Sequence, residues 1–345
     1  MGFSIEFVNK ESFITLEKDW KVLERGDDMT VFQSFDWNKM LVDVYLPDDT
    51  HNYESCFAIV RNSMRIVLIA PLWIVKRNFR LLNKKGIYLI GREGWSDYLN
   101  CIYESFDKDA FAFLISQVSC RYKIQHICFE NIKETTQLFY FIKNNYSDVI
   151  IERGPCVSLD LPRTIEDYSK MLSKNSRQNI RTANNRLTKD KKSIEYRFND
   201  RLVDKVRCSE IRENKLTKQY NSVSSIRKYK YRLMNKLRFH FKSYFPLYDY
   251  PQGQVMSAYI DGKLCAYFNY AIDENKKSVI VMAAGTDLQY ARYSPGILLM
   301  YNFVKTSIEE GNLRLVDFTR GDEQYKFALG GILNNNYNLS FCTNI

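Results

Sequence analysis

The stretch from Ser278 to Lys326 constrains the fold of this chain more than any other. A run of apolar, partly β-branched residues from Ser278 to Ala284 predicts a buried strand. Pro295 follows a polar loop and is expected at the first position of a helix, where its missing N–H has no consequence. We expect that helix to end at Gly311, and Leu313–Phe318 is the next predicted strand. The pattern predicts a strand, a helix and a second strand that pairs with the first.

A turn that leads into a helix N-terminus is suited to anions, because backbone N–H groups and the helix dipole face the ligand. We expect Ser294 to cap the helix with its side chain. The N–H groups of Gly296, Ile297 and Leu298 are then expected to point toward a bound anion. A single turn of this kind more often only caps a helix, so a purely structural role is the alternative.

The chain is long enough for two hydrophobic cores. With 345 residues, of which 45% are hydrophobic and 26% charged, it has the composition of ordinary globular domains. We place the domains at residues 1–155 and 156–345. Both halves contain a predicted hairpin, a strand, a helix and a further strand. The first half has the acidic segment ESFDKDAF before its helix, so only the second half is expected to keep an anion site.

Charge and composition narrow the classes of partner. The formal net charge of +10 favours anionic partners, among them nucleic acid, acidic membranes, nucleotide-linked substrates and coenzyme A. No standard nucleic-acid reading motif occurs, so DNA is not an expected partner. The eight cysteines form no C-x-x-C pair and there are three histidines, so we expect neither a disulfide framework nor a metal site. No signal peptide or transmembrane run is visible, and a cytoplasmic location is expected.

Five segments of the chain follow an order typical of one enzyme superfamily, and each is weak alone. They are Gly91–Asn100 (GREGWSDYLN), Leu172–Leu187 (LSKNSRQNIRTANNRL), Tyr259–Tyr270 (YIDGKLCAYFNY), Tyr293–Met300 (YSPGILLM) and Asp317–Lys326 (DFTRGDEQYK). On these segments the chain resembles the CelD-like branch of the GNAT acyltransferases, found in polysaccharide-biosynthesis loci, and more remotely the FemAB-type peptidyltransferases. The resemblance implies an α/β (mixed α+β) fold of two tandem GNAT-like domains, each a mixed twisted sheet flanked by helices. It also implies an active site at their junction, with a degenerate first domain on the acceptor side and an acyl-CoA site in the second.

The resemblance implies acetyl-CoA or another acyl-CoA as cosubstrate. The residues expected to hold it are Ala283, Ala284, Arg292, Ser294, Gly296, Ile297 and Leu298. The usual pyrophosphate loop of the superfamily is Q/R-x-x-G-x-G/A. Here Ser294 stands at the first glycine, and Arg292 lies one place later than the basic or amide residue of that pattern.

Acyl transfer to an amine needs a base near the amine and an acid near the leaving thiolate. We expect Glu323 to act as the base and Tyr325 as the acid. Many members of the superfamily have a tyrosine four residues before a glycine, in a Y-x-x-x-G-F turn, and Tyr325 resembles it but stands five residues before Gly330. Lys326 matches the lysine of the FemAB-type Phe-Lys pair and would steady negative charge. Asp317 completes the catalytic candidates, with a structural hydrogen bond as its alternative. For the cluster as a whole, the alternative is a solvated helix cap.

The acceptor is expected to be an anionic small molecule. Lys174, Arg177 and Arg181 are spaced to share one helix face and would grip its phosphates. Asp97 and Tyr98 are expected to line the acceptor pocket. The alternative for the three basic residues is a helix face that is simply solvated. The alternative for Asp97 is that it caps a turn.

The sequence thus predicts an N-acyltransferase that transfers acetyl from acetyl-CoA to a nucleotide- or lipid-linked amino sugar in surface polysaccharide biosynthesis. One alternative is a FemAB-type transferase, for which aminoacyl-tRNA would be a partner. Another is a non-catalytic binding protein with a decayed site. The segment Arg227–Lys242 alternates basic and aromatic residues, which suggests peripheral membrane contact or an ordinary amphipathic helix.

Overall fold

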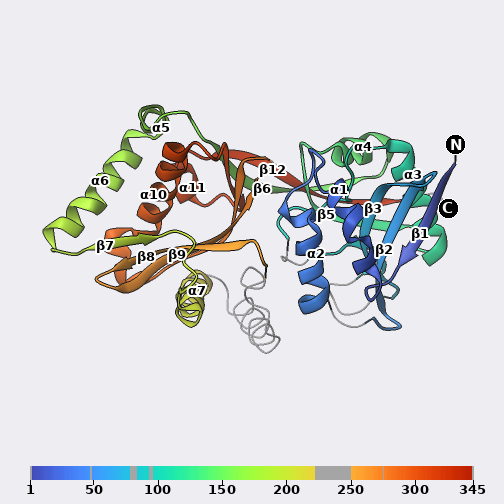
Figure 1. The fold of residues 1–345 in the computed structure, drawn as a ribbon, viewed down its shortest axis with the longest axis horizontal. Coiled ribbons are helices and arrows are strands. Elements are labelled where there is room, and N and C mark those ends of the chain that lie inside the picture. The colour runs from blue at the N-terminus through green and yellow to red at the C-terminus, as the bar shows by residue number, and fades with distance from the viewer. Residues whose placement is uncertain are drawn as a thin grey trace. The chain divides into compact units, whose positions relative to one another are not determined.

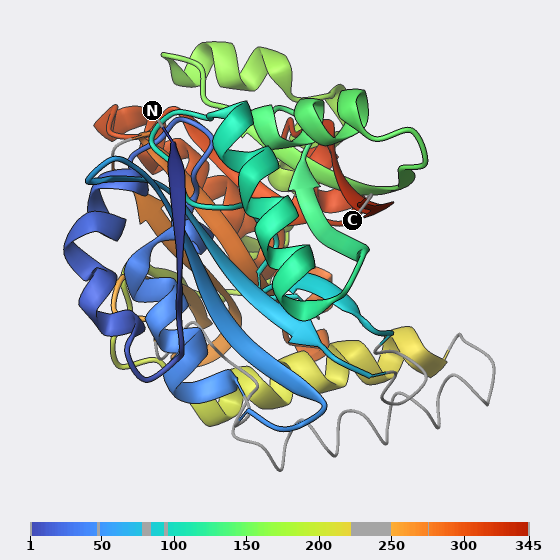
Figure 2. The same cartoon turned by 90° about the vertical axis from the view of Figure 1, so that its right-hand side faces the viewer.

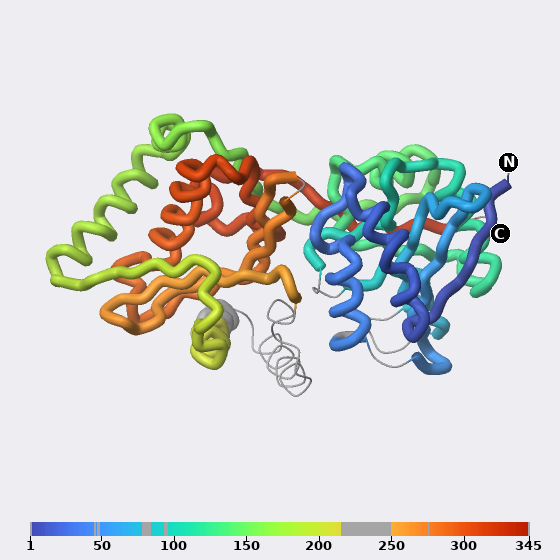
Figure 3. The backbone as a smooth tube through the Cα atoms, viewed as in Figure 1, coloured from blue at the N-terminus to red at the C-terminus, as the bar shows by residue number. Residues whose placement is uncertain are grey.

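The computed structural model describes residues 2–46, 49–77, 84–92, 96–221, 250–274 and 276–343. The chain forms two compact units, Met1–Pro155 with Asn334–Ile345, and Cys156–Leu333 (Figure 1). The assignment of residues 334–345 to the second domain was wrong. These residues form most of a strand that pairs with a strand of the first unit, and Figure 3 shows that both chain ends lie in that unit.

The first unit is a mixed sheet with helices on its faces. Its elements are β1 (Phe3–Val8), η1 (Phe13–Leu16), α1 (Glu17–Leu23), η2 (Val31–Gln33), α2 (Phe35–Met40), η3 (Leu41–Tyr45), β2 (Tyr53–Asn62), β3 (Arg65–Val75), β4 (Gly86–Leu89), α3 (Lys108–Tyr122), β5 (His126–Lys133) and α4 (Gln137–Asn145). The strand order is β1-β2-β3-β4-β5-β12, where β12 spans Ile332–Cys342. Among the described residues of this unit, β4 and β5 pair in parallel, whereas β1–β2, β2–β3, β3–β4 and β5–β12 pair antiparallel. Figure 2 shows α3, which connects these two strands, lying across one face of the sheet.

The second unit repeats this plan. Its elements are β6 (Ile150–Asp160), α5 (Ile165–Met171), α6 (Lys174–Lys189), β7 (Ile194–Arg197), α7 (Lys205–Asn221), β8 (Gly253–Ile260), β9 (Lys263–Asp273), β10 (Ser278–Thr286), η4 (Leu288–Tyr293), α10 (Pro295–Glu310), β11 (Leu315–Arg320) and α11 (Gln324–Ala328). The strand order is β7-β8-β9-β10-β11-β6; in the part of this unit that the structure describes, β10 and β11 pair in parallel and the other neighbouring strands pair antiparallel. A parallel pair needs a crossover connection, which α10 supplies here as α3 does in the first unit.

Both units therefore have one topology with an exchanged last strand. The strand that follows β5 and α4 in the chain is β6, whose second half pairs with β11 of the second unit. The strand that follows β11 and α11 is β12, which pairs with β5. The fold class expected from the sequence, mixed sheets flanked by helices, is confirmed.

Two apolar clusters cover the two faces of the second sheet. Along β8, Met256 packs into the cluster formed with α5, α6 and α10, whereas Val255 packs into a smaller cluster with Cys208 and Ile211 of α7. This is the alternation expected of a strand that is covered on both faces. The sheet thus presents one face to α10 and the other to α7.

Several local predictions hold because they rest on backbone conformation. Pro295 is the first residue of α10, and Gly311 ends the helix with a φ of 66°. The hairpin expected in the second half is formed by β8 and β9, and its turn residues Asp261 and Gly262 both have positive φ, 49° and 76°, as a type I′ turn requires. The segment Arg227–Lys242 and Trp95 of the Gly91–Asn100 motif lie outside the described residues.

Candidate active site

The two parallel strands of the second unit separate after a short paired segment. Ser278–Ile280 of β10 pairs with Leu315–Asp317 of β11, and beyond this segment the two described strands no longer pair. The pairing of β10 with β9 also shifts register between Val281 and Ala283. A gap therefore opens inside the sheet, and two cavities are lined by residues of the second half of β10.

Thr319 spans the start of this gap. Its Oγ1 donates a hydrogen bond of 3.0 Å to the carbonyl oxygen of Val281, which lies on the separating strand. Its backbone has a φ of 57°, which is unusual for a β-branched residue and is held by its surroundings. The carboxylate of Asp317 accepts the N–H of Thr319 at 2.8 Å.

Asp317 is therefore a positioning residue. It is 3% exposed and lines neither cavity, so its expected place among the catalytic residues was wrong. Its carboxylate is committed to the bend of β11 that carries Thr319.

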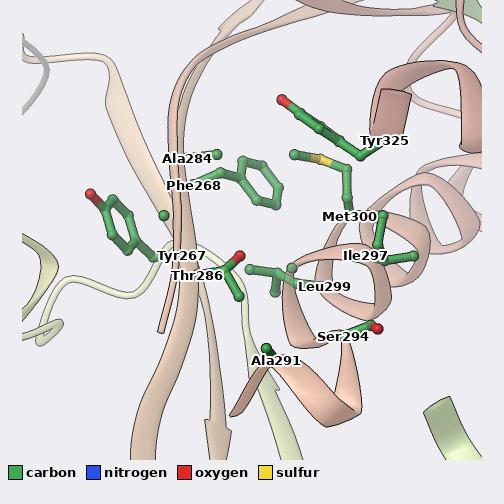
Figure 4. Close-up of a pocket in the computed structure, with 12 residues that line it drawn as sticks. Tyr267, Phe268, Ala284, Thr286, Ala291, Ser294, Ile297, Leu299, Met300 and Tyr325 are labelled. Carbon is green, nitrogen blue, oxygen red and sulfur yellow. The ribbon is translucent and has the colours of Figure 1, made fainter. Parts of the chain in front are cut away.

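The first cavity has a volume of about 310 Å³ and is mostly apolar. Its lining comprises Tyr267, Phe268, Ala284, Gly285, Thr286, Ala291, Ser294, Gly296, Ile297, Leu299, Met300 and Tyr325. In Figure 4, Phe268 and Met300 point toward each other, while Thr286 and Ser294 mark the end nearer the start of α10. The lining suits an apolar chain with a polar group at the helix end.

The turn before α10 differs from its expected geometry. Ser294 adopts a left-handed conformation, with a φ of 49°, and its side chain makes no capping hydrogen bond. Its carbonyl oxygen instead accepts the N–H groups of Ile297 at 3.0 Å and Leu298 at 3.1 Å. The expectation that these two N–H groups face a ligand was wrong, and Leu298 is a core residue that is 2% exposed. Among the described residues, the N–H of Gly296 has no acceptor.

Gly296 has close neighbours that exclude a side chain. A Cβ atom at this position would lie 2.3 Å from Thr286 Oγ1. Arg292 does not line the cavity, because its guanidinium forms an ion pair with Asp190 at 3.1 Å. One backbone donor, rather than three donors and an arginine, therefore marks this end of the cavity.

The second cavity, of about 190 Å³, is polar and shares Ala284 and Tyr325 with the first. It is lined by Arg212, Val281, Met282, Ala283, Ala284, Phe318, Thr319, Arg320, Glu323, Tyr325 and Lys326. The predicted base, acid and lysine thus lie around one cavity.

Lys326 is a buried organiser of this site. It is 2% exposed, and its Nζ donates to the carbonyl oxygens of Arg320 at 2.7 Å, Gly321 at 3.0 Å and Thr319 at 3.3 Å. It also forms an ion pair with Glu323 Oε2 at 2.9 Å. Since an ammonium group has three donors, these partners occupy its capacity. Lys326 holds the end of β11 and orients the carboxylate of Glu323.

Tyr325 lies at the boundary of the two cavities. Burial, followed by the nearby carboxylate of Glu323, raises its pKa above the ordinary value of 10.0. Within the described part of the chain its hydroxyl has no hydrogen-bond partner. The group is therefore protonated at neutral pH and has a donor available to a ligand.

The basic residues expected to bind the acceptor lie on α6 and line neither cavity. Lys174 and Arg181 are exposed on that helix. Arg177 donates to the carbonyl oxygens of Ser169 at 2.8 Å and Leu172 at 2.6 Å. Its guanidinium thus caps the C-terminal end of α5, which corrects its expected role in phosphate binding.

Asp97 and Tyr98 belong to the first unit and line neither of these cavities. Tyr98 is 2% exposed, and its ring lies 4.4 Å from the Lys133 ammonium. The carbonyl oxygen of Asp97 accepts a hydrogen bond of 3.4 Å from Asn336. Tyr98 is a core residue, which corrects the expectation that it lines a pocket.

Among the lining residues that sequence reasoning missed are Thr286, Thr319, Arg212 and Arg320. In the sequence Thr286 and Thr319 look like ordinary strand residues, and no motif marks either of them as part of a site. Arg212 lies in a basic helix whose contact with β10 is not encoded in a motif. Arg320 was within a recognised segment, and its position at the end of a strand was a usable signal.

Two further findings concern other kinds of site. Throughout the described ranges, no helix has the length and apolarity needed to cross a membrane. The same part of the chain contains no group of three or more His, Cys, Asp or Glu side chains that could hold a metal ion.

Comparison with known proteins places the catalytic candidates inside a recognised domain. Residues 174–327 match the family described as Acetyltransferase (GNAT) domain. No curated protein matched the sequence.

Solved structures resemble the whole chain. FemX is 9% identical, with a TM-score of 0.61 and coverage of 99% of this chain and 98% of FemX. A conserved protein of unknown function from Bacteroides thetaiotaomicron is 11% identical, with a TM-score of 0.57 and coverage of 99% and 100%. L-PGS from Bacillus licheniformis is 10% identical, with a TM-score of 0.50 and coverage of 95% and 92%. At these identities the likeness concerns the fold alone.

The prediction of two tandem GNAT-like domains is confirmed by the repeated topology and the family match. Residues 174–327 carry the separated parallel strands, both cavities and every catalytic candidate. Residues 174–327 thus form a GNAT domain, and the chain as a whole resembles FemX in fold.

Proposed function

We propose that this protein is an N-acyltransferase that takes an acyl group, in the first instance acetyl, from acyl-CoA. The separation of β10 from β11 carries this proposal, because it joins an apolar cavity that ends at a free backbone N–H to a polar cavity with a base and an acid. A thioester chain in the first cavity would bring its carbonyl to the boundary at Ala284 and Tyr325. The acceptor amine would enter the second cavity.

The residues divide the chemistry between them. The Glu323 carboxylate, oriented by Lys326, takes a proton from the attacking amine. The Tyr325 hydroxyl, protonated at neutral pH, gives a proton to the leaving thiolate. The N–H of Gly296 binds a phosphate oxygen of the coenzyme at the start of α10. Ala283 and Ala284 lie on the separating strand, where backbone donors would stabilise the carbonyl oxygen.

The acceptor we propose is an amino sugar, nucleotide- or lipid-linked, in surface polysaccharide biosynthesis. This part of the proposal rests on the CelD-like resemblance of the sequence and on the net charge of +10. The first unit is proposed to lie on the acceptor side and the second to hold the acyl donor.

A second candidate is a FemAB-type transfer from aminoacyl-tRNA. The observation that favours it is the small number of anion-binding groups before α10. The N–H of Gly296 has no acceptor among the described residues, whereas the N–H groups of Ile297 and Leu298 bond to Ser294 and Arg292 is paired with Asp190. The overall likeness to FemX agrees with it at the level of the fold. A third candidate is a binding protein with a decayed site.

Calorimetric titration separates these candidates. Acetyl-CoA is expected to bind the wild-type chain with micromolar to submillimolar affinity, and a pool of aminoacyl-tRNA is not expected to compete with it. Absence of heat at millimolar acetyl-CoA would remove the lead proposal. Binding of aminoacyl-tRNA in its place would establish the second candidate, and binding of neither would favour the third.

A further inference from the structure

Asn269 is a buried polar residue in the middle of the second sheet that neither the fold nor the proposed chemistry uses. It lies on β9, within the recognised segment Tyr259–Tyr270, and its side chain is 0% exposed. Within the part of the chain that the structure describes, neither its Oδ1 nor its Nδ2 has a hydrogen-bond partner. Most buried polar groups in native proteins are paired, so this carboxamide is an exception.

The side chain of Asn269 faces α7. Its neighbours along the strand, Phe268 and Tyr270, pack into the cluster on the α10 side. Its cross-strand partner on β8 is Val255, which belongs to the smaller cluster formed with α7. Figure 4 shows the same alternation one step earlier, because Tyr267 and Phe268 lie on opposite sides of the strand. Cross-strand partners share a face of the sheet, so Asn269 lies on the side of Val255.

The carboxamide of Asn269 is a neighbour of the second cavity. Its partner on β10 is Ala283, where the pairing with β9 resumes after the shift in register. Ala283 lines the second cavity, and so does Arg212 of α7. Cross-strand partners have Cβ atoms about 4.5–5.5 Å apart, and an alanine side chain ends at Cβ. Asn269 therefore lies directly beside the part of the cavity wall that Ala283 forms.

A carboxamide at this position costs folding free energy. The residues around it on this face, Val255, Cys208 and Ile211, are apolar. A buried donor or acceptor without a partner keeps its full desolvation penalty, whereas a valine would have no such penalty and suits a strand better. Residues that weaken the fold in this way are typical of binding sites, where the ligand supplies the missing partner.

The chemistry of the carboxamide specifies the kind of partner. The group is neutral, accepts through Oδ1 and donates through Nδ2. A hydroxyl group, which also accepts and donates, matches both functions. The cavity volume of about 190 Å³ is below the range of about 300–1,000 Å³ usual for small-molecule sites, so only one end of an acceptor enters. An amine that faces Glu323 and a hydroxyl that reaches Asn269 must then be close together in that molecule.

We propose that Asn269 is a specificity residue that binds a hydroxyl group next to the reacting amine of the acceptor. The assignment of the amine rests on the proposed function, whereas the binding of a neutral hydrogen-bonding group by Asn269 does not. Since the side chain is closed to solvent, binding requires the carboxamide to rotate past the methyl group of Ala283. Asn269 takes no part in proton transfer.

Urea unfolding tests whether the carboxamide has a structural role instead. Asn269→Ala and Asn269→Val are expected to leave the urea midpoint unchanged or to raise it, because each removes a polar group that the described residues leave without a partner. Asn38→Ala is the matched control and should lower the midpoint. Asn38 is 3% exposed, and its Nδ2 donates to the carbonyl oxygens of Phe32 at 3.1 Å and Ser34 at 2.9 Å. A fall in both Asn269 variants as large as that in Asn38→Ala would overturn the inference.

Two probes that differ by a single hydroxyl group test the binding. They are trans-2-aminocyclohexanol and cyclohexylamine, both cations at neutral pH, titrated by calorimetry without an acyl donor. We expect the wild type to bind the amino alcohol about three- to tenfold more tightly, which is the effect of one hydrogen bond. Asn269→Ala and Asn269→Val should bind the two probes equally, and Asn38→Ala should keep the wild-type preference.

Three results would overturn the specificity role. They are equal affinity of the wild type for the two probes, no binding of either probe at about 10 mM, or an undiminished preference in Asn269→Val. Titration of acetyl-CoA into the same samples separates this test from the proposed function. If acetyl-CoA fails to bind while the preference depends on Asn269, the proposed donor is wrong and the hydroxyl-binding role stands. If acetyl-CoA binds and the preference is absent, the donor stands and this role is wrong.

Discussion

The two units share a topology and differ in what fills the gap between their parallel strands. In the first unit, Ile87–Tyr88 of β4 pairs with Ile127–Cys128 of β5, much as β10 pairs with β11 in the second. Each second strand then bends at a residue of positive φ, Asn131 at 56° and Thr319 at 57°. The common fold therefore provides an opening in both units.

In the first unit the chain closes this opening itself. The N–H of Leu99 donates to the carbonyl oxygen of Asn131 at 3.1 Å. The guanidinium of Arg92 stacks on the Tyr88 ring at 3.8 Å and pairs with Glu130 at 2.9 Å. In the second unit, the corresponding space is the pair of cavities that meet at Tyr325.

The two units also differ at the start of the helix that follows the first parallel strand, which is α3 in the first unit and α10 in the second. The Asp107 carboxylate accepts the N–H groups of Asp109 at 2.9 Å and Ala110 at 3.1 Å at the start of α3. At the start of α10 the N–H of Gly296 is left without an acceptor in the described chain. One copy of the fold uses its own acid at the anion position, and the other leaves that position open. The difference teaches that side chains, rather than topology, decide which copy is able to bind a substrate.

The largest expected effects are at the acid and the base. Tyr325→Phe and Glu323→Gln should each lower kcat by about 10²–10⁴-fold, because each removes a group to which we assign a proton-transfer role. Acetyl-CoA affinity should change little in either variant. Steady-state assays of thiol release measure kcat, and Asp322→Asn is the control because Asp322 is an exposed neighbour that lines neither cavity.

The pH dependence gives an independent readout of Tyr325. Its pKa is raised above 10.0, so its acid form persists through the neutral and moderately alkaline range. We expect the wild-type rate to show no loss from tyrosine ionisation below about pH 10. Wild-type turnover in Tyr325→Phe, or an alkaline decline near neutrality that this variant abolishes, would show that the assigned role is wrong.

Filling the helix end of the first cavity is expected to weaken donor binding next most strongly. In Gly296→Ala the new Cβ would meet Thr286 Oγ1 at 2.3 Å, so the turn must shift and the free N–H with it. The acetyl-CoA Kd should rise by about tenfold or more. Since the nearest atoms all belong to Thr286, the double variant Gly296→Ala with Thr286→Ala should recover much of the affinity. Full affinity in the single variant would show that the coenzyme does not use this turn.

Removal of Arg92, which lies in the gap between the parallel strands of the first unit, should affect stability rather than binding. Arg92→Ala leaves Glu130 without its ion-pair partner and removes the stack on Tyr88, so we expect a loss of about 1–3 kcal/mol in the free energy of unfolding. Urea denaturation measures it, with acetyl-CoA affinity unchanged. Arg65→Ala breaks the exposed pair with Glu104 and should cost about 0–1 kcal/mol. Loss of acetyl-CoA binding in Arg92→Ala would refute the division of roles between the units.

The smallest expected effect is at the residue that spans the gap. Thr319→Val removes the donor to the carbonyl oxygen of Val281 and should lower the free energy of unfolding by about 1 kcal/mol. Thr319→Ser keeps the hydroxyl and should be closer to the wild type. Thermal or urea unfolding compares the two. An equal loss in both would show that the hydroxyl does not hold the opening.

The sequence predicted the elements that local chemistry determines. Pro295 and Gly311 mark the ends of α10 because their backbone preferences are intrinsic. The family motifs led to Glu323, Tyr325 and Lys326, which the structure gathers around one cavity.

Features that depend on distant pairing were not predictable. The exchange of β6 and β12 follows from contacts between residues far apart in the chain, for which the polar run at Asn334–Asn336 gives no signal. Because Ser294 is left-handed, its carbonyl oxygen accepts the N–H groups of Ile297 and Leu298, which were expected to bind an anion. No sequence pattern identifies this conformation in a serine. The roles of Arg177 and Arg292 were misjudged because their partners, a carbonyl pair and Asp190, depend on packing.

Hydrogen–deuterium exchange with and without millimolar acetyl-CoA tests most directly which unit holds the donor. We predict protection over residues 281–300, which include the free end of β10 and the first turns of α10, and no change over residues 84–92 and 107–122 of the first unit. Protection of the first-unit segments, or of neither region under conditions where acetyl-CoA binds, would contradict the proposal that the open gap of the second unit is the donor site.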